Sequence, residues 1–210
     1  MKTEIATLII LFSSTACSAP DRLEMPPISG PPPGWGSFTL TTMPESDCPI
    51  IAGEYSEPPS IYRSREVEGF LPKDNLDLYS SYIPFHLGER REMETNDINL
   101  PGDHFWIRQP DAAQFFFVYL NDRTGTLVEY HFRSEEGDFE CQDGHIEFPN
   151  YEINGMIEGR SVNFQIRNIL IKDEQDALII QSTRGPFRGT AKMTENSFTT
   201  EFFRYPKNER

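Results

Sequence analysis

The chain has 210 residues, of which 33 are acidic and 19 are basic, so its formal net charge is −14. This charge argues against a general nucleic-acid binder, because such a protein needs a basic surface that displaces counterions from phosphates. It argues equally against attachment to anionic lipid through a polybasic patch. The 16 Phe, 8 Tyr and 2 Trp residues favour pleated, half-buried surfaces and indicate a β-rich protein.

The first sixteen residues have the layout of a secretory signal. Lys2 lies in a short polar start, an apolar run occupies residues 5–12, and small residues occupy 13–16. The apolar run is too short to cross a bilayer as a helix, which needs about 20 residues. Glu4 offsets the charge of Lys2 and departs from the usual basic start. We expect residues 1–16 to be a cleaved signal peptide.

Cys17 follows directly, and Ser14-Thr15-Ala16-Cys17 resembles the lipobox of bacterial lipoproteins. In that family the thiol carries lipid after cleavage; Ser14 stands where an aliphatic residue is usual. The resemblance implies that Cys17 becomes a lipidated N-terminus, which binds the membrane through acyl chains without basic residues. Ser18, where Asp would favour the inner membrane, implies an outer-membrane protein that faces the periplasm of a Gram-negative cell. The alternatives are a plain secreted protein, or a buried N-terminal element with an incidental Cys.

Residues 17–36 are predicted to form a tether, with a single antiparallel β domain over 37–210. The tether is rich in proline and lacks a period of 2 or 3.6 residues. Such a segment favours polyproline II and acts as a semi-rigid spacer of about 3.1 Å per residue. The alternative for Pro31, Pro32 and Pro33 is a ligand for an aromatic groove.

Cys48 and Cys141 remain if Cys17 takes lipid, because the chain has 3 Cys. An exported chain lies in an oxidising compartment, so these two are expected to form a disulfide. The bond would close a loop of about a hundred residues and contribute roughly 4.7 kcal/mol in the chain-entropy model. Metal ligation is the alternative, but the sequence has neither Cys-x-x-Cys nor a close pair of His. We expect no metal and no cofactor.

Strand patterns dominate the chain after Ala113. An apolar run at 114–120 predicts a buried strand, and apolar and polar residues alternate over 126–133, with a Gly-containing hairpin loop at 121–125 between them. Residues 168–171 break the alternation, which indicates a bulge or a stretch buried on both faces. The further predicted strands cover residues 145–148, 162–167, 178–180, 187–193 and 198–205, with a polar turn at 172–176.

The region before Ala113 is less regular. A first strand is expected at 48–55, an irregular segment at 57–111, a short helix at 74–82 and a charged, solvated stretch at 89–94. The fold class is therefore all-β and mainly antiparallel, with about seven to eight strands. Because the sequence offers no helical crossover, we expect sequential pairing in a small up-and-down barrel or a sandwich. The strands are too few, and their polar faces too charged, for a lipid-spanning barrel.

This arrangement resembles a group of Gram-negative lipoproteins that have no assigned activity. The residues that carry the resemblance are Cys48-Pro49 with Gly53-Glu54-Tyr55, the stretch 141–146 that begins with Cys141, and the closing aromatic stretch 202–205. The resemblance covers about residues 48–205, and it implies location and architecture but no activity.

The sequence shows no strong catalytic signal. It lacks HExxH, G-x-S-x-G and a Gly-rich phosphate loop, and its acidic bursts at 135–138 and 173–176 lack the calcium-loop pattern and are expected to be turns. His131 and His145 are expected in solvent on the polar faces of strands. We therefore expect a non-catalytic binding or accessory module, with a protein partner in the envelope that the sequence does not identify. The alternative is a hydrolytic enzyme with a site in 57–111, which would need at least two of His86, His104 and the nearby acids to converge in a cleft.

A second alternative concerns Phe115, Phe117 and Tyr119, which lie on one face of a predicted strand. In a small closed barrel these rings would line an apolar pocket, and the protein would be a lipocalin-like carrier of a small apolar ligand. The other interpretation is ordinary core packing, since aromatic side chains dominate protein cores.

Overall fold

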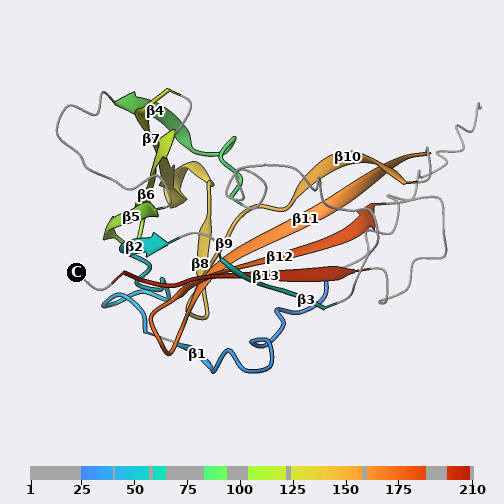
Figure 1. Ribbon diagram of the computed structural model, residues 1–210, viewed down its shortest axis with the longest axis horizontal. Coiled ribbons are helices and arrows are strands. Elements are labelled where there is room, and N and C mark those ends of the chain that lie inside the picture. Colours follow the sequence, from blue (N-terminus) through green and yellow to red (C-terminus); the bar gives the residue numbers. More distant parts are fainter. Residues whose placement is uncertain are drawn as a thin grey trace, which may run out of the picture.

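The protein consists of two antiparallel β-sheets of eight and five strands, which do not close into a barrel (Figure 1). The computed structural model describes residues 25–39, 41–56, 59–64, 83–93, 104–121, 124–157, 160–187 and 198–208. The all-β, antiparallel prediction is confirmed, whereas closure into an up-and-down barrel is not observed. Within these ranges no helix is long and apolar enough to cross a membrane. The predicted helix at 74–82 lies outside the described residues.

More strands form than the sequence predicted, because short edge strands have weak local patterns. The strands are β1 Phe38–Thr39, β2 Gly53–Ser56, β3 Ser60–Arg63, β4 Glu89–Met93, β5 His104–Asp111, β6 Gln114–Asn121, β7 Thr126–Arg133, β8 Glu140–Gln142, β9 His145–Glu147, β10 Tyr151–Ile157, β11 Arg160–Asp173, β12 Leu178–Phe187 and β13 Thr199–Tyr205. A 3-10 turn, η1, spans Ser134–Glu136. Three strands, β3, β4 and β5, lie in the segment that was expected to be irregular, and the strand expected from residue 48 begins only at Gly53.

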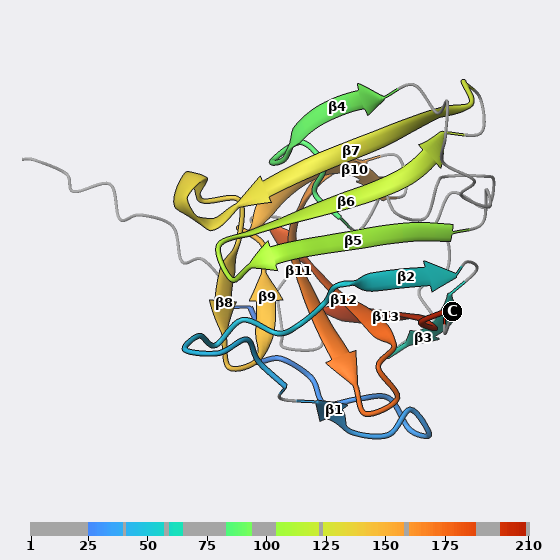
Figure 2. The same ribbon diagram turned by 90° about the vertical axis from the view of Figure 1, so that its left-hand side faces the viewer.

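The two sheets cross each other face to face. Figure 2 shows the five-stranded sheet, in the order β2-β5-β6-β7-β4, in front of the long strands β11 and β12 of the other sheet. The eight-stranded sheet has the order β3-β13-β12-β11-β9-β8, with β1 and β10 also paired to β11. Pairing is therefore sequential in the β5-β6-β7 and β10-β11-β12-β13 meanders. It is not sequential at β2-β5, β4-β7 and β3-β13.

Two local predictions are confirmed in detail. The β6–β7 hairpin closes with Asn121 opposite Thr126, and Gly125 in its loop has φ +67°, a left-handed conformation that glycine adopts without strain. In β11, residues 168–171 pair with β12 in continuous register and are buried. The break in alternation there marks a stretch buried on both faces and not a bulge.

The aromatic core lies between the sheets. Successive rings pack directly on one another: Phe105 and Phe117 have centroids 4.8 Å apart, and Phe115 and Phe132 are also 4.8 Å apart. From the eight-stranded sheet, Leu170, Leu178, Ile180, Phe203 and Tyr205 face these rings.

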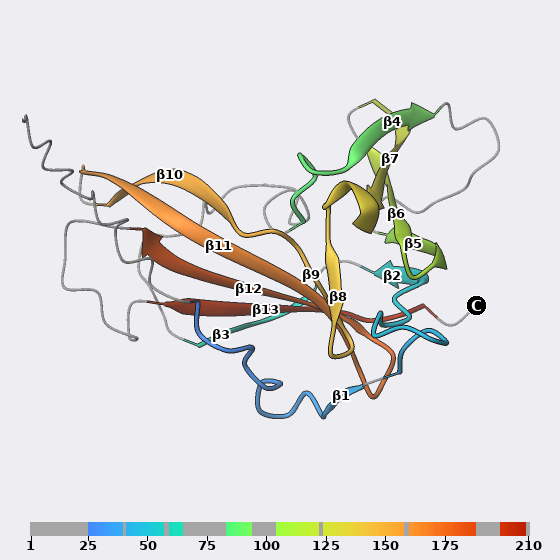
Figure 3. The same ribbon diagram turned by 180° about the vertical axis from the view of Figure 1, so that it is seen from behind.

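The outer face of the eight-stranded sheet is covered by residues 25–39, seen in blue along the sheet in Figures 1 and 3. Trp35 and Phe38 pack against an apolar cluster of Ile171, Ile179 and Phe202. Pro32 is buried. The second half of the predicted tether therefore lies on the domain and does not stand clear of it.

Candidate functional site

The predicted disulfide is present, and the predicted lipidation site Cys17 lies outside the described residues. Cys48 and Cys141 are bonded, with their Cα atoms 4.7 Å apart. The bond connects β8, at the edge of the eight-stranded sheet, to the segment that leads into β2. Cys48 is fully buried beside the aromatic core, so the disulfide ties the two sheets together at the core.

The rings of Phe115, Phe117 and Tyr119 point into the space between the sheets, as their alternation predicted. Phe115 and Phe117 are fully buried, and Phe117 contacts the ring of Phe85 at a centroid distance of 5.3 Å. This ring-to-ring packing favours the core interpretation of these residues over a ligand cavity.

The expectation that His131 and His145 are solvated was wrong. Only 8% of His131 and 4% of His145 is exposed. His131 stacks on Phe116 with centroids 4.1 Å apart, and its Nε2 lies 3.0 Å from Gln114 Oε1. Burial, and secondly the positive charge of Arg133, lowers the pKa of His131. The His131 ring is covered by Phe116 and by Arg133, whose Nη2 lies 2.7 Å from His131 Nδ1.

The other two histidines have separate surroundings. The ring of His86 is exposed and lies 5.3 Å from the ring of Tyr151, measured between centroids. His104 begins β5 and contacts Glu54 and Ser56 of β2. The contacts described for His86 and for His104 therefore lie in different parts of the fold. His104 contacts an acid and a hydroxyl of β2, Glu54 and Ser56, which no sequence motif marks as a site.

A polar cluster surrounds His104 at the β2 edge of the five-stranded sheet. His104 Nδ1 lies 3.0 Å from Glu54 Oε1, and His104 Nε2 lies 3.4 Å from Ser56 Oγ. Asn208, near the C-terminus, completes the cluster: its Oδ1 accepts a hydrogen bond from Ser56 Oγ at 2.5 Å. Its Nδ2 lies 3.3 Å from Glu54 Oε1.

The local sequence explains half of this cluster. Because side chains alternate along a strand, Glu54 and Ser56 share one face of β2 while Tyr55 points to the core. Ser56 is directly opposite His104 in the β2–β5 register. Asn208 arrives because the chain after β13 runs beside β2, where its backbone N–H donates to the Glu54 carbonyl at 2.9 Å. Strand alternation in Gly53–Ser56 could therefore have predicted that Glu54 and Ser56 share a face. No pattern along the chain predicts that His104 and Asn208 join them.

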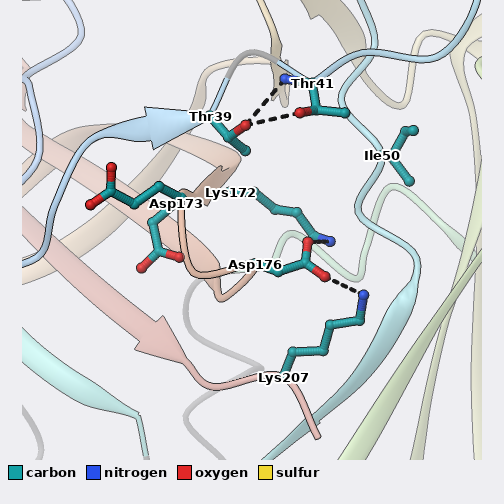
Figure 4. A pocket seen from close by; sticks show the side chains of 8 residues that line it. Thr39, Thr41, Ile50, Lys172, Asp173, Asp176 and Lys207 are labelled. Atoms are coloured by element: carbon teal, nitrogen blue, oxygen red, sulfur yellow. Dashed lines mark hydrogen bonds and ion pairs between the residues drawn. The ribbon is translucent and has the colours of Figure 1, made fainter. Parts of the chain in front are cut away.

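A small charged groove lies beside Lys207, the residue that precedes Asn208 (Figure 4). It has a cavity volume of about 270 Å³. The residues that line it are Thr39, Thr41, Ile50, Lys172, Asp173, Glu174, Asp176 and Lys207. The sequence assigned residues 172–176 to a polar turn. Lys172 and Asp173 are nevertheless buried, with 4% and 1% exposed.

Asp176 connects the two lysines of the groove. Lys172 Nζ pairs with one of its carboxylate oxygens and Lys207 Nζ with the other. Burial lowers the pKa of Lys172, against the opposing effect of Asp176. Burial alone would raise the pKa of Asp176, but the hydrogen bonds from both lysines outweigh it and lower that pKa. Asp173 is held separately by Arg204, whose Nε donates to Asp173 Oδ2 at 2.6 Å.

No group of three or more His, Cys, Asp or Glu side chains that could hold a metal ion occurs in the part of the chain that the structure describes. No family model matches the chain, and neither a curated protein nor a solved structure matches it.

Proposed function

We propose that the chain is a lipid-anchored protein of the Gram-negative cell envelope, which faces the periplasm from the outer membrane and acts there as a binding or accessory module. The Cys48–Cys141 disulfide is the observation that supports this most directly. Disulfides persist in oxidising compartments such as the periplasm and are rare in the cytosol. With two of the three cysteines bonded to each other, Cys17 is left to carry lipid, as its resemblance to a lipobox implies.

Lipid anchoring suits the charge of the chain. A chain of net charge −14 gains nothing from anionic headgroups, whereas each acyl methylene that enters the bilayer contributes about 0.8 kcal/mol regardless of protein charge. Part of the predicted tether lies on the domain, because Arg167 donates to the Pro26 carbonyl and Trp35 and Phe38 pack on the eight-stranded sheet.

The groove around Asp176 supports a binding role for a small polar ligand. Its volume of about 270 Å³ lies just below the range of about 300–1,000 Å³ that is usual for small-molecule sites. Among the residues that the structure describes, its lining offers two ammonium groups, carboxylates and two threonine hydroxyls, with Ile50 as the apolar member. Such a lining suits a small ligand with charges of both signs. The carrier alternative, with an apolar ligand between the sheets, has no comparable support because the rings there pack on one another.

Replacement of the lipid-bearing thiol tests the anchoring. Cys17→Ser should abolish incorporation of labelled fatty acid and release the protein from the membrane fraction. The control is a Cys48→Ala/Cys141→Ala double variant, which lacks the disulfide but should still take up label. Unchanged fractionation and labelling of Cys17→Ser would overturn the proposal.

Native mass spectrometry tests the carrier alternative. Protein purified gently from envelopes should carry no lipid beyond that attached to Cys17, and it should not take up a fluorescent fatty acid. A stoichiometric apolar ligand that is lost in a Phe117→Ala variant would favour the carrier instead.

A further inference from the structure

The cluster around His104 lies on the solvent side of the five-stranded sheet. Tyr55 and Phe105 stack at a centroid distance of 5.4 Å on the inner face. Glu54, Ser56 and His104, which alternate with them, therefore lie on the outer face. The His104 side chain is 20% exposed and that of Glu54 is 13% exposed. The cluster is thus ordered by its surroundings and still reachable from water.

Glu54, His104 and Ser56 contact one another in the order acid, imidazole, hydroxyl. The ring nitrogens of His104 lie against an acid and a hydroxyl: Nδ1 meets the Glu54 carboxylate at 3.0 Å and Nε2 meets the Ser56 hydroxyl at 3.4 Å. Asn208 Nδ2 also lies 3.3 Å from Nδ1 and 3.4 Å from Nε2. A carboxylate at Nδ1 favours the tautomer whose Nε2 accepts a proton, and that nitrogen then faces a hydroxyl. This sequence of acid, imidazole and hydroxyl is the arrangement that activates serine in acyl transfer, on several unrelated folds.

Asn208 holds the hydroxyl in a resting position. Ser56 Oγ donates its single proton to Asn208 Oδ1 at 2.5 Å, while His104 Nε2 also lies within reach of the same oxygen. Rotation about the Cβ–Oγ bond transfers the hydrogen bond from the amide to the imidazole without movement of the oxygen. The contact of 3.4 Å is long, as catalytic hydrogen bonds often are before substrate binds. Asn208 Nδ2 lies 3.3 Å from Glu54 Oε1 and within 3.4 Å of both His104 ring nitrogens, so the same amide also positions the acid and the imidazole.

We propose that Ser56, His104 and Glu54 form a hydrolytic site for small neutral carboxylic esters. Ser56 Oγ bonds to the ester carbonyl carbon while its proton passes to His104 Nε2. The carbonyl–alkoxy bond then breaks, and the departing alkoxide takes that proton. Water attacks the resulting acyl-serine in the same way, so the products are an alcohol and a carboxylic acid and Ser56 is restored. Glu54 stays ionised throughout and steadies the imidazolium. The activity goes beyond the accessory role and replaces the expectation that the chain is not an enzyme.

The surroundings indicate the substrate class. Trp106 is directly opposite Glu54 in the register, so its half-buried ring lies on the same outer face. It packs in an apolar cluster with Phe116 and Leu120. An apolar acyl or aryl group of an ester would rest against this ring. The net charge of −14 disfavours anionic esters through long-range repulsion.

The site is tested with the full chain in mild detergent. A fluorophosphonate probe should label Ser56, identified by peptide mapping, and p-nitrophenyl butyrate should be hydrolysed. Ser56→Ala should abolish the label, and His104→Gln should lower kcat/KM by roughly 10²- to 10⁴-fold. Ser60→Ala, at an exposed serine of β3, is the matched control and should change neither. No labelling of Ser56 in folded protein, or hydrolysis unchanged in Ser56→Ala, would overturn the proposal.

A second readout does not depend on turnover. In Ser56→Cys the new thiol should react with iodoacetamide at least about tenfold faster than in Ser56→Cys/His104→Gln, because a neighbouring imidazole favours the thiolate. Equal rates in two folded variants would mean that His104 does not act on position 56. Both readouts leave Cys17 untouched, so failure here is distinct from failure of the proposed anchoring.

Discussion

Trp35 packs edge-on against Phe202, with ring centroids 6.4 Å apart and an interplanar angle of 77°. This contact joins the Pro-rich N-terminal segment to the outer face of β13. A second contact reinforces it, since Arg167 Nη2 donates to the Pro26 carbonyl at 2.5 Å. The segment that composition marked as a spacer is therefore in part a covering layer of the eight-stranded sheet.

The covering segment should loosen when its tryptophan is removed. Trp35→Ala deletes a half-buried ring, and we expect a loss of roughly 1–2 kcal/mol. The backbone amides of residues 33–39 should then exchange about tenfold faster in hydrogen–deuterium exchange. The control is Trp106→Ala. Trp106 lies on the five-stranded sheet, away from this segment, so its removal should leave exchange in residues 33–39 unchanged. Identical exchange in both variants would show that Trp35 does not hold the segment.

Loss of the disulfide should destabilise the domain strongly. It joins residues 93 apart in sequence, and a loop of that length corresponds to about 4–5 kcal/mol in the chain-entropy model. Cys48→Ala/Cys141→Ala should lower the urea midpoint accordingly. A reductant should lower the midpoint of the wild type but leave the double variant unchanged. A double variant as stable as the oxidised wild type would contradict this.

The core interpretation of the central rings predicts a large effect at Phe117. This side chain is fully buried, so Phe117→Ala should cost about 3–5 kcal/mol of unfolding free energy. Tyr62→Ala is the control, because Tyr62 is 37% exposed and its loss should cost less than about 1 kcal/mol. Denaturant unfolding measures both. A small effect at Phe117 would instead favour a cavity at these rings.

Stability should fall in alkali because of Tyr55. Burial, and secondly the Asp176 carboxylate, raises the pKa of Tyr55 above the ordinary 10.0. The folded protein keeps the phenolic proton, while the unfolded chain releases it. The contribution of Tyr55 is therefore complete below pH 10 and is lost as the pH rises beyond it, by about 1.4 kcal/mol per unit.

Tyrosinate absorbance during an alkaline titration checks this behaviour. Tyr55 should ionise only as the protein unfolds, and Tyr55→Phe should remove that late component. The same variant should be less stable at neutral pH, since it loses the hydrogen bond from Tyr55 Oη to the Ile51 carbonyl at 2.6 Å. Tyr62→Phe is the matched control and should leave the late component in place. Early, reversible ionisation of Tyr55 in folded protein would contradict the assignment.

The sequence by itself determined the features that depend on neighbouring residues along the chain. Alternation over 126–133 and the Gly-containing loop before it predicted the β6–β7 hairpin, because turn and strand preferences act over a few residues. The cysteine count and the predicted export signal together indicated the Cys48–Cys141 pair. In the apolar run at 114–120, the two-residue period of a strand placed Phe115 and Phe117 on one face.

Only the tertiary structure decided which strands became neighbours, and with that the candidate sites. Ser56 meets His104 because β2 pairs with β5, and Asn208 joins them because the C-terminus runs beside β2. Lys172 is buried although the sequence placed it in a polar turn, because the residues that line the groove, Asp176 among them, surround its side chain. Strand order and register between distant segments follow from the burial of both sheets against each other. No local pattern encodes that balance of packing and chain entropy.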